Sequence, residues 1–342
     1  MNLIVLGGTR FLGRHFVEAA LARGHAVTIF TRGRIAVPWM GGVRHLVGDR
    51  DPATAPGLAA LADGSWDAAI DCSGYVPRCV RASAQMLAGH AGRYLFVSSM
   101  SAYAEPVVAR SDESEPVATL DDPASEDVTA HYGALKAACE REVVAAFGAE
   151  RATIIRPGLI VGPHDSTDRF GYWVARFAAP ALLGDRGEEI VVPAPPERPI
   201  QFIDARDLAV WMVVLVERRM AGVYNACSEA GQWTMGDLVD ALMDSAQRRG
   251  RVPRPVWIDE AALLAAGVAP WTGLPLWIPG NDPAMAGFLE IGCRRAHRAG
   301  LALRPLAATV ADTLQWLLAR DNAGAWQKAL TAREERSLVA GR

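Results

Sequence analysis

Tyr132 and Lys136 carry side chains that could exchange a proton with a substrate, and they stand four residues apart in the chain. The pattern around them predicts a helix from about Tyr132 to Phe147. On such a helix the phenol and the ammonium lie one turn apart on the same face. A free phenol with a pKa of about 10 is a poor base at neutral pH, but a neighbouring lysine cation favours the phenolate. The pair is therefore a candidate general acid and base.

Two serines follow the short apolar run from Leu95 to Val97. This run predicts an inner strand, so Ser98 and Ser99 would lie at its carboxyl end, where ligands bind in open α/β sheets. The Ser99 hydroxyl could bond a substrate oxygen and stabilise the negative charge that develops on it. Taken singly, the serines could instead cap the strand end, and a tyrosine and lysine at this spacing also occur by chance. The combination of serine, tyrosine and lysine carries the catalytic prediction.

A glycine-rich segment follows the first apolar run, Leu3 to Leu6, and precedes a helical pattern that ends near Arg23. This order predicts a strand, a tight turn and a helix. Glycines at such a turn let the backbone approach a pyrophosphate, which then binds to the amides of the helix N-terminus. The predicted cofactor-binding residues of this segment are Gly7, Thr9, Arg10, Phe11, Leu12 and Gly13.

The second predicted strand, Ala26 to Phe30, is followed by Thr31-Arg32-Gly33-Arg34, which contains no acidic residue. Proteins specific for NAD place an acid at this point to bind the 2′-hydroxyl of the adenosine ribose. Arginines could pair with a 2′-phosphate instead. Arg32, helped by Arg34 or Arg10, therefore favours NADP(H) over NAD(H), although these arginines could also belong to a solvated loop.

Short apolar runs alternate with helical patterns through the first half of the chain, and a further strand is expected near residues 152–155. This alternation predicts an α/β fold with a doubly wound parallel sheet, a Rossmann fold. Loops rich in Pro, Gly and Trp indicate a smaller C-terminal substrate-binding lobe. We expect residues 1–160 and 198–228 to form the dinucleotide-binding domain and residues 161–197 and 229–342 to form the lobe.

These motifs together resemble the extended short-chain dehydrogenases/reductases, the NAD-dependent epimerase/dehydratase family. The glycine-rich segment departs from the family pattern at Arg10, which stands where the family has its middle glycine. The segments from Arg156 to Pro163 and from Gln201 to Ala209 also resemble family motifs, so the likeness covers residues 1 to about 230. The resemblance implies that Ser99, Tyr132 and Lys136 are catalytic, that Tyr132 and Lys136 also contact the cofactor, and that Asp49 lies near the adenine ring.

The family contains several reactions, and the residues beside Ser99 help to choose among them. Sugar dehydratases of the family have Asp-Glu after the catalytic residue, whereas Met100-Ser101 stand here, so dehydration is disfavoured. An NADP(H)-dependent reductase or dehydrogenase acting on a carbonyl or carbinol carbon is favoured, and a nucleotide-sugar epimerase that retains NAD is the alternative. A non-catalytic cofactor-sensing or RNA-binding member of the family is the alternative from another class.

The expected substrate pocket uses residues beside the triad and in the loops after residue 161. Its aromatic, histidine and arginine side chains suit a small, cyclic or sugar-like, partly polar metabolite. His164 could be an auxiliary acid or a structural residue. The predicted substrate-binding residues are Ser99, Tyr103, His164, Asp165, Arg169, Tyr172 and Trp173.

Composition limits the choice of partners. The 342 residues carry a formal net charge of -3, which gives no general attraction for nucleic acid or acidic membranes. The five cysteines are scattered without metal-type spacing, so neither a disulfide framework nor a metal site is expected. No charged segment precedes an apolar signal-type stretch, which predicts the cytoplasm. A small molecule is the expected partner, and the sequence leaves a homodimer open.

Overall fold

A seven-stranded parallel sheet forms the centre of one lobe of the molecule. The structure is a computed structural model that describes residues 1–184, 186–320, 326 and 329–341. The strand order is β11-β6-β5-β4-β1-β2-β3. The strands are β1 (Asn2–Leu6), β2 (Ala26–Thr31), β3 (Arg44–Val47), β4 (Ala68–Asp71), β5 (Tyr94–Val97), β6 (Ala152–Pro157) and β11 (Gly222–Ala226). Because all neighbours are parallel, their carboxyl ends meet at one edge of the sheet. The doubly wound α/β fold expected from the sequence is confirmed.

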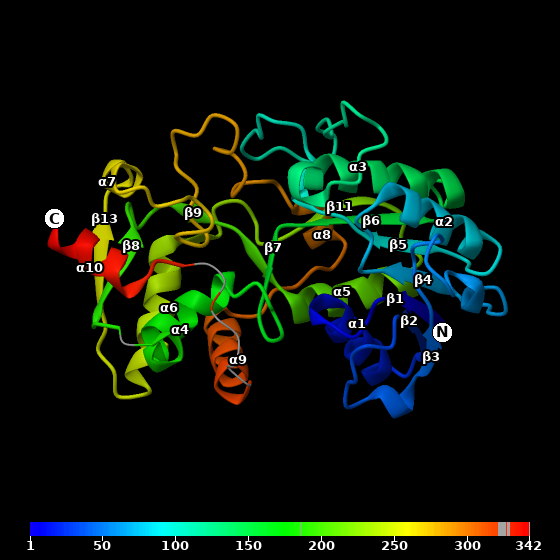
Figure 1. Cartoon of the computed structure of the whole chain (residues 1–342), viewed down its shortest axis with the longest axis horizontal. Coiled ribbons are helices and arrows are strands. Elements are labelled where there is room, and N and C mark those ends of the chain that lie inside the picture. The colour runs from blue at the N-terminus through cyan, green and yellow to red at the C-terminus, as the bar shows by residue number, and fades with distance from the viewer. Residues whose placement is uncertain (185, 321–325, 327–328, 342) are drawn as a thin grey trace.

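Helices cover both faces of this sheet (Figure 1). On one face α1 (Phe11–Ala22) packs against α5 (Ala205–Glu217), and on the other α2 (Pro77–Ala88) packs against α3 (Val128–Phe147). Successive β1 side chains alternate between the two layers: Leu3 and Val5 belong to the core with α1, and Ile4 and Leu6 to the core with α2. A strand buried on both faces has apolar residues at every position, which is why β1 reads as an unbroken apolar run.

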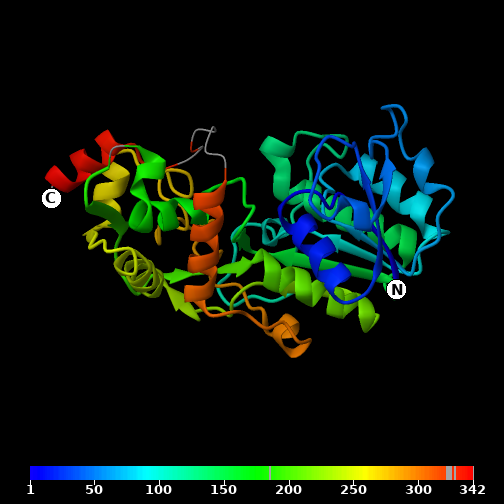
Figure 2. The ribbon, with the colours of Figure 1, turned by 90° about the horizontal axis from the view of Figure 1, so that it is seen from below.

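A second lobe lies beside the sheet, with the C-terminus at its far end and the N-terminus in the sheet lobe (Figures 1 and 2). Its core is made by α4 (Arg169–Ala178), α6 (Met235–Gln247) and α9 (Leu306–Ala319), with the parallel pair β8 (Glu189–Pro193) and β13 (Arg254–Ile258). Smaller elements complete the chain: β7 (Leu159–Val161), β9 (Pro199–Ile200), β10 (Phe202–Asp204), β12 (Trp233–Thr234), α7 (Glu260–Ala265), α8 (Arg294–Arg298) and α10 (Ala332–Ala340). The domain boundaries expected from the sequence stay a prediction.

Three general findings bear on function. In the part of the chain that the structure describes, no helix is long and apolar enough to cross a membrane. The described residues also contain no group of three or more His, Cys, Asp or Glu side chains placed to hold a metal ion. All five cysteines are described and are free thiols.

Candidate active site

The glycine-rich turn after β1 brings the backbone close to the start of α1. Gly7 and Gly8 have φ values of +102° and +99°, which side chains with a Cβ rarely adopt. A Cβ on Gly13 would lie 2.8 Å from the Gly8 nitrogen, so the helix can approach the turn only with glycine there. No side chain caps the N-terminus of α1 at Arg10, which leaves its first amides available to an anion. This geometry fits the pyrophosphate of a dinucleotide.

The arginines predicted to select the cofactor lie on the exposed surface after β2. Arg32 and Arg34 are exposed, and Gly33 between them has a φ of +71° and donates its N–H to the Thr31 hydroxyl. Among the described residues, no ion pair engages Arg10, Arg32 or Arg34, and each could still bind a phosphate. Asp49 is half-buried and its carboxylate accepts the N–H of Asp51, as in a local turn.

Lys136 lies on α3 with its amine at the carboxyl ends of β4 and β5. Its Nζ donates to the carbonyl oxygens of Gly74 (2.8 Å) and Val97 (2.6 Å) and lies 4.6 Å from the centre of the Phe96 ring. Burial lowers the pKa of Lys136 to about 8. Gly74 follows Ser73, and Ser73 borders the glycine-rich turn because Gly7 approaches it. The amine of Lys136 is therefore fixed close to this turn.

A buried ion pair beneath Lys136 was not predicted from the sequence. The Asp71 carboxylate ends β4 fully buried and accepts two hydrogen bonds of 2.8 Å from Arg50 and one of 2.9 Å from the Tyr94 hydroxyl. Burial alone would raise the pKa of Asp71, but Arg50 outweighs it and holds this pKa below its usual value. The negative charge of Asp71 in turn supports the ammonium form of Lys136.

Tyr132 and Ser99 meet where α3 touches the turn after β5. The backbone of α3 is kinked at His131, and a Cβ on Gly133 would lie only 1.9 Å from the carbonyl oxygen of Ser101. The Ser99 hydroxyl is close enough to lower the pKa of the Tyr132 phenol, and the Tyr132 residue keeps 36% of its surface exposed. Ser99 Oγ also accepts the N–H of Ser101 at 3.1 Å, which orients the hydroxyl.

The expected effect of Lys136 on Tyr132 needs correction. Burial raises the pKa of the Tyr132 phenol, and the groups that offset this are the Ser99 hydroxyl and the positive charge of Arg169. Lys136 is not among these groups, and its amine donates to the carbonyl oxygens of Gly74 and Val97. The structure thus brings together Ser99, Tyr132 and Arg169, with Lys136 alongside.

The arginine of the Arg156-Pro157 segment forms a buried ion pair in the core. Arg156 pairs with Glu140 on α3 at 2.7 Å in the interior, and the Ser98 hydroxyl donates to the same carboxylate at 2.5 Å. This network fixes α3 against β5 and β6. Tyr103 is buried in it: its ring lies 4.7 Å from the Arg156 guanidinium, and its hydroxyl donates to Asn225 at 2.7 Å. The structure therefore places Tyr103 in the core, away from a substrate role.

The loop after β7 carries two of the predicted substrate-binding residues, His164 and Asp165, and a third, Arg169, begins α4 directly after it. His164, with a φ of +68°, packs between His15 and Trp316 at ring distances of 5.5 and 5.7 Å. Burial lowers the pKa of His164 to about 4, so the imidazole is neutral at physiological pH. Asp165 is buried and its Oδ1 accepts two hydrogen bonds from Thr167. Only Arg169 of this group acts on the Tyr132 phenol through its charge.

Tyr172 and Trp173 do not join this group. Both side chains are fully buried in the core of the second lobe, and the Trp173 indole donates to the carbonyl oxygen of Pro275 at 2.8 Å. Every residue of α4 from Phe170 to Ala178 is buried, so the helix is a core element rather than one wall of a pocket.

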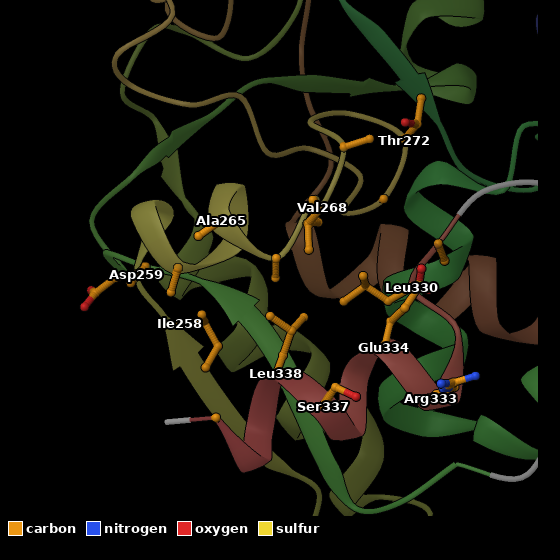
Figure 3. Close-up of a pocket in the computed structure, with 18 of the residues that line it drawn as sticks. Ile258, Asp259, Ala265, Val268, Thr272, Leu330, Arg333, Glu334, Ser337 and Leu338 are labelled. Carbon is orange, nitrogen blue, oxygen red and sulfur yellow. The ribbon is translucent and has the colours of Figure 1, made fainter.

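A cavity of about 1300 Å³ lies elsewhere, in the second lobe between α7, α10 and the loop before residue 274 (Figure 3). Apolar side chains line its interior, among them Ile258, Val268, Leu330 and Leu338. None of the predicted site residues lines it. The cavity is therefore separate from the candidate active site.

Comparisons with known proteins agree with the fold and the motifs. Residues 3–227 match the NAD dependent epimerase/dehydratase family. Because the match covers more than half of the chain, the protein belongs to this family. A 2-alkyl-3-oxoalkanoate reductase from Stenotrophomonas maltophilia (strain K279a) is 32% identical over 182 residues, which are 48% of this chain and 52% of the relative. The chain thus matches about half the length of this curated relative.

Solved structures give the same fold over nearly the whole chain. A structure from Burkholderia cenocepacia J2315 has 23% identity and a TM-score of 0.68, covering 93% of this chain and 98% of that one. Bordetella bronchiseptica WbmH in complex with NAD+ has 16% identity and a TM-score of 0.66, covering 93% and 98%. UDP-glucose 4-epimerase from Bifidobacterium longum, in complex with NAD+ and UDP, has 17% identity and a TM-score of 0.62, covering 95% and 100%. At these identities the likeness establishes the fold alone.

Proposed function

We propose that the protein is an NADP(H)-dependent oxidoreductase that acts on a carbonyl or carbinol carbon of a small metabolite. The observation that carries this proposal is that Ser99 and Tyr132 meet where α3 packs on the turn after β5, close enough for the Ser99 hydroxyl to lower the pKa of the Tyr132 phenol, with the buried amine of Lys136 at the same strand ends. In this reading Tyr132 donates a proton to the substrate oxygen in reduction or accepts it in oxidation. Ser99 bonds the same oxygen as its charge develops. A bound dinucleotide would supply or accept the hydride.

The binding residues follow from the same geometry. The uncapped start of α1 and the turn at Gly7 and Gly8 suit the pyrophosphate, and Lys136 lies where it could bond the hydroxyls of the nicotinamide ribose. Family membership supports a nicotinamide dinucleotide of some kind. The similarity to the Stenotrophomonas reductase supports the reduction of a carbonyl.

The NADP(H) preference rests on the exposed Arg32 and on the absence of an acid after β2. A charge-assisted hydrogen bond to a 2′-phosphate is worth about 1.5–3 kcal/mol, which corresponds to a preference of about tenfold or more. We expect NADPH to bind at least about tenfold more tightly than NADH, and Arg32→Ala to remove most of this difference. Titration of the purified protein with both cofactors, followed by fluorescence, measures it.

A matched control is Arg44→Ala. Arg44 is also exposed, but it begins β3 and so lies toward the amino ends of the strands, whereas Arg32 follows the carboxyl end of β2. The control should leave the ratio of the two dissociation constants unchanged. Equal constants for NADPH and NADH in the unaltered protein would refute the preference.

The second candidate function is a nucleotide-sugar epimerase that retains NAD. The fold it shares with the Bifidobacterium epimerase, which was solved with NAD+ and UDP, favours this alternative. An epimerase regenerates its cofactor within each cycle and keeps it bound. Release of stoichiometric NAD+ on denaturing the freshly purified protein would favour the epimerase, and a cofactor-free protein that oxidises added NADPH would favour the reductase.

The cytoplasmic location, a small-molecule partner without nucleic acid or membrane, and a homodimer stay predictions of the sequence. The predicted division into two domains and the catalytic, cofactor-binding and substrate-binding roles of the site residues also stay predictions.

A further inference from the structure

Tyr75 carries an aromatic ring that lies directly beside the proposed catalytic residues. It stands between β4 and α2, and its ring centre lies 6.4 Å from that of Tyr132, with the two ring planes 38° apart. The Lys136 amine lies 5.1 Å from the centre of the Tyr75 ring. Tyr75 therefore borders both side chains of α3 that the proposed chemistry uses.

The ring of Tyr75 is open to solvent. Tyr75 keeps 46% of its surface exposed, and Tyr132 keeps 36%. Among the residues that the structure describes, no other tyrosine, tryptophan or phenylalanine is exposed to this extent. Aromatic side chains are usually well buried, because contact of their apolar surface with water is unfavourable. Two exposed rings side by side at the reacting groups therefore indicate a surface that a ligand covers.

The turn that carries Tyr75 is held in place on both sides. The Ser73 N–H donates to the Asp71 carboxylate at 2.9 Å, and the Ser73 hydroxyl donates to the carbonyl oxygen that ends β1 at 3.1 Å. A Cβ on Gly74 would lie 2.5 Å from the Phe96 ring, so the turn packs closely on β5. A ring on a fixed turn loses little conformational freedom when a ligand stacks on it, which favours binding.

The polar side chains around this ring are already engaged. Asp71 is paired with Arg50, and the Ser73 hydroxyl accepts a hydrogen bond of 3.2 Å from the same guanidinium. Backbone carbonyl oxygens take two of the three donor hydrogens of the Lys136 amine. A sugar ring bound here would need partners for several hydroxyls, whereas a flat apolar ring needs only a ring surface. The surroundings of Tyr75 therefore suit an aromatic group better than a sugar.

A ring stacked on Tyr75 would lie next to the hydroxyl that exchanges the proton. Aromatic rings pack in offset or tilted arrangements with their centres about 4.5–7 Å apart, and Tyr75 and Tyr132 are themselves this close. We infer that Tyr75 is the stacking surface for an aromatic ring of the substrate, which makes aromatic ketones and the corresponding alcohols the substrate class of the proposed oxidoreductase. This inference rests on the proposed function and narrows it.

The test compares aromatic ketones with their saturated counterparts. Methyl phenyl ketone is paired with methyl cyclohexyl ketone, and phenylacetone with cyclohexylacetone. Their dissociation constants are measured by calorimetry on protein saturated with NADP+, or with NAD+ if that binds more tightly, because the oxidised cofactor cannot reduce a ketone. The unaltered protein should bind the aromatic member of at least one pair about fivefold more tightly, as expected for one stacked pair of rings.

Three variants show whether Tyr75 causes this preference. Tyr75→Leu keeps an apolar side chain without the ring and should remove the preference, whereas Tyr75→Phe keeps the ring and should retain it. Leu264→Ala is the control for the loss of an exposed apolar side chain, because Leu264 lies on α7 in the second lobe. It should leave the ratio of the two dissociation constants unchanged.

Four results would overturn the inference. Neither pair shows a preference for the aromatic ketone, or the preference survives in Tyr75→Leu. Tyr75→Leu weakens binding of the cofactor and leaves the preference between ketones intact, which would make the ring a contact of the nicotinamide. UDP-glucose binds more tightly than either aromatic ketone, which would favour a sugar substrate.

Failure of the inference is distinguishable from failure of the proposed function. If Tyr132→Phe abolishes the reduction of the cyclohexyl ketones by NADPH but aromatic ketones are not preferred, the oxidoreductase assignment stands and only the role of Tyr75 is lost. If aromatic ketones bind with the expected preference but Tyr132→Phe reduces them as fast as the unaltered protein, the proposed chemistry is wrong and the stacking surface stands.

Discussion

Replacing Gly133 by alanine should separate the two hydroxyls on which the proposed chemistry depends. A Cβ at this position would lie 1.9 Å from the carbonyl oxygen of Ser101, 2.9 Å from its carbonyl carbon and 3.6 Å from its Cβ. Real Cβ atoms essentially never approach another heavy atom within 3.0 Å, so the start of α3 and the turn after Ser99 must move apart by about 1 Å or more. Tyr132 is the neighbouring residue and moves with the helix.

A misplacement of about 1 Å between reacting groups can cost about 10²-fold in rate, or about 2.7 kcal/mol of transition-state stabilisation. We therefore expect Gly133→Ala to lower kcat/KM about 100-fold. Cofactor affinity should change less, because the pyrophosphate site at Gly7 and Gly13 lies on other elements. The split between catalysis and cofactor binding is the expected signature.

The assay is steady-state oxidation of NADPH with the best carbonyl substrate, together with titration of NADPH and thermal unfolding. Gly89→Ala is the matched control: Gly89 ends α2 with a φ of -90°, and an added Cβ would meet no atom within 4 Å. It should behave as the unaltered protein. A folded Gly133→Ala protein with kcat/KM within about twofold of the unaltered protein would refute the geometry on which this prediction depends.

Two further predictions concern the interior beneath the site. Burial lowers the pKa of Lys136 to about 8, so its amine loses its charge as the pH rises through that value, and NADPH affinity should fall over the same range. Lys136→Arg stays charged, so it should bind NADPH more weakly at pH 7 but show no such fall. Titrations with NADPH between pH 6 and 10 measure this, and a flat profile in the unaltered protein would contradict the assignment. Asp71→Asn leaves the Arg50 guanidinium buried without its counter-charge and should cost about 3–5 kcal/mol in the free energy of unfolding, measured in urea; a cost below about 1 kcal/mol would show that the pair is dispensable.

The parallel sheet could be predicted because burial on both faces requires apolar residues along each strand, and this pattern is visible in each strand separately. β1, β4 and β5 are short and apolar at nearly every position, β1 is followed by Gly7 and β5 by Ser98, and none of these features depends on a distant partner. The same reasoning placed the candidate catalytic side chains on their elements, since Ser99 follows a strand end and Tyr132 lies near a helix start.

The environment of those side chains could not be predicted, because it depends on contacts between segments distant in sequence. Lys136 stands one turn from Tyr132, yet its amine is bound by carbonyls that follow β4 and end β5. The Asp71 and Arg50 pair joins residues that carry no common motif. A carboxylate at the last position of a fully apolar strand was the available signal, since an acid in such a place requires a partner.

The aromatic residues around the expected substrate pocket misled the prediction for a different reason. Aromatic side chains occur both in ligand sites and in cores, and composition does not separate the two. Tyr172 and Trp173 lie on a helix that is buried all round, and Tyr103 fills the space beside a buried ion pair.

The most direct test of the central claim is the rate of hydride transfer in Tyr132→Phe, which removes the hydroxyl and keeps the ring. In a single-turnover experiment, protein loaded with NADPH is mixed with the best ketone substrate and the loss of cofactor absorbance is followed. We expect an unchanged dissociation constant for NADPH and a rate lowered by about 10² to 10⁴, the range for a lost general acid. A rate within about twofold of the unaltered protein would contradict it and place the proton transfer on another group.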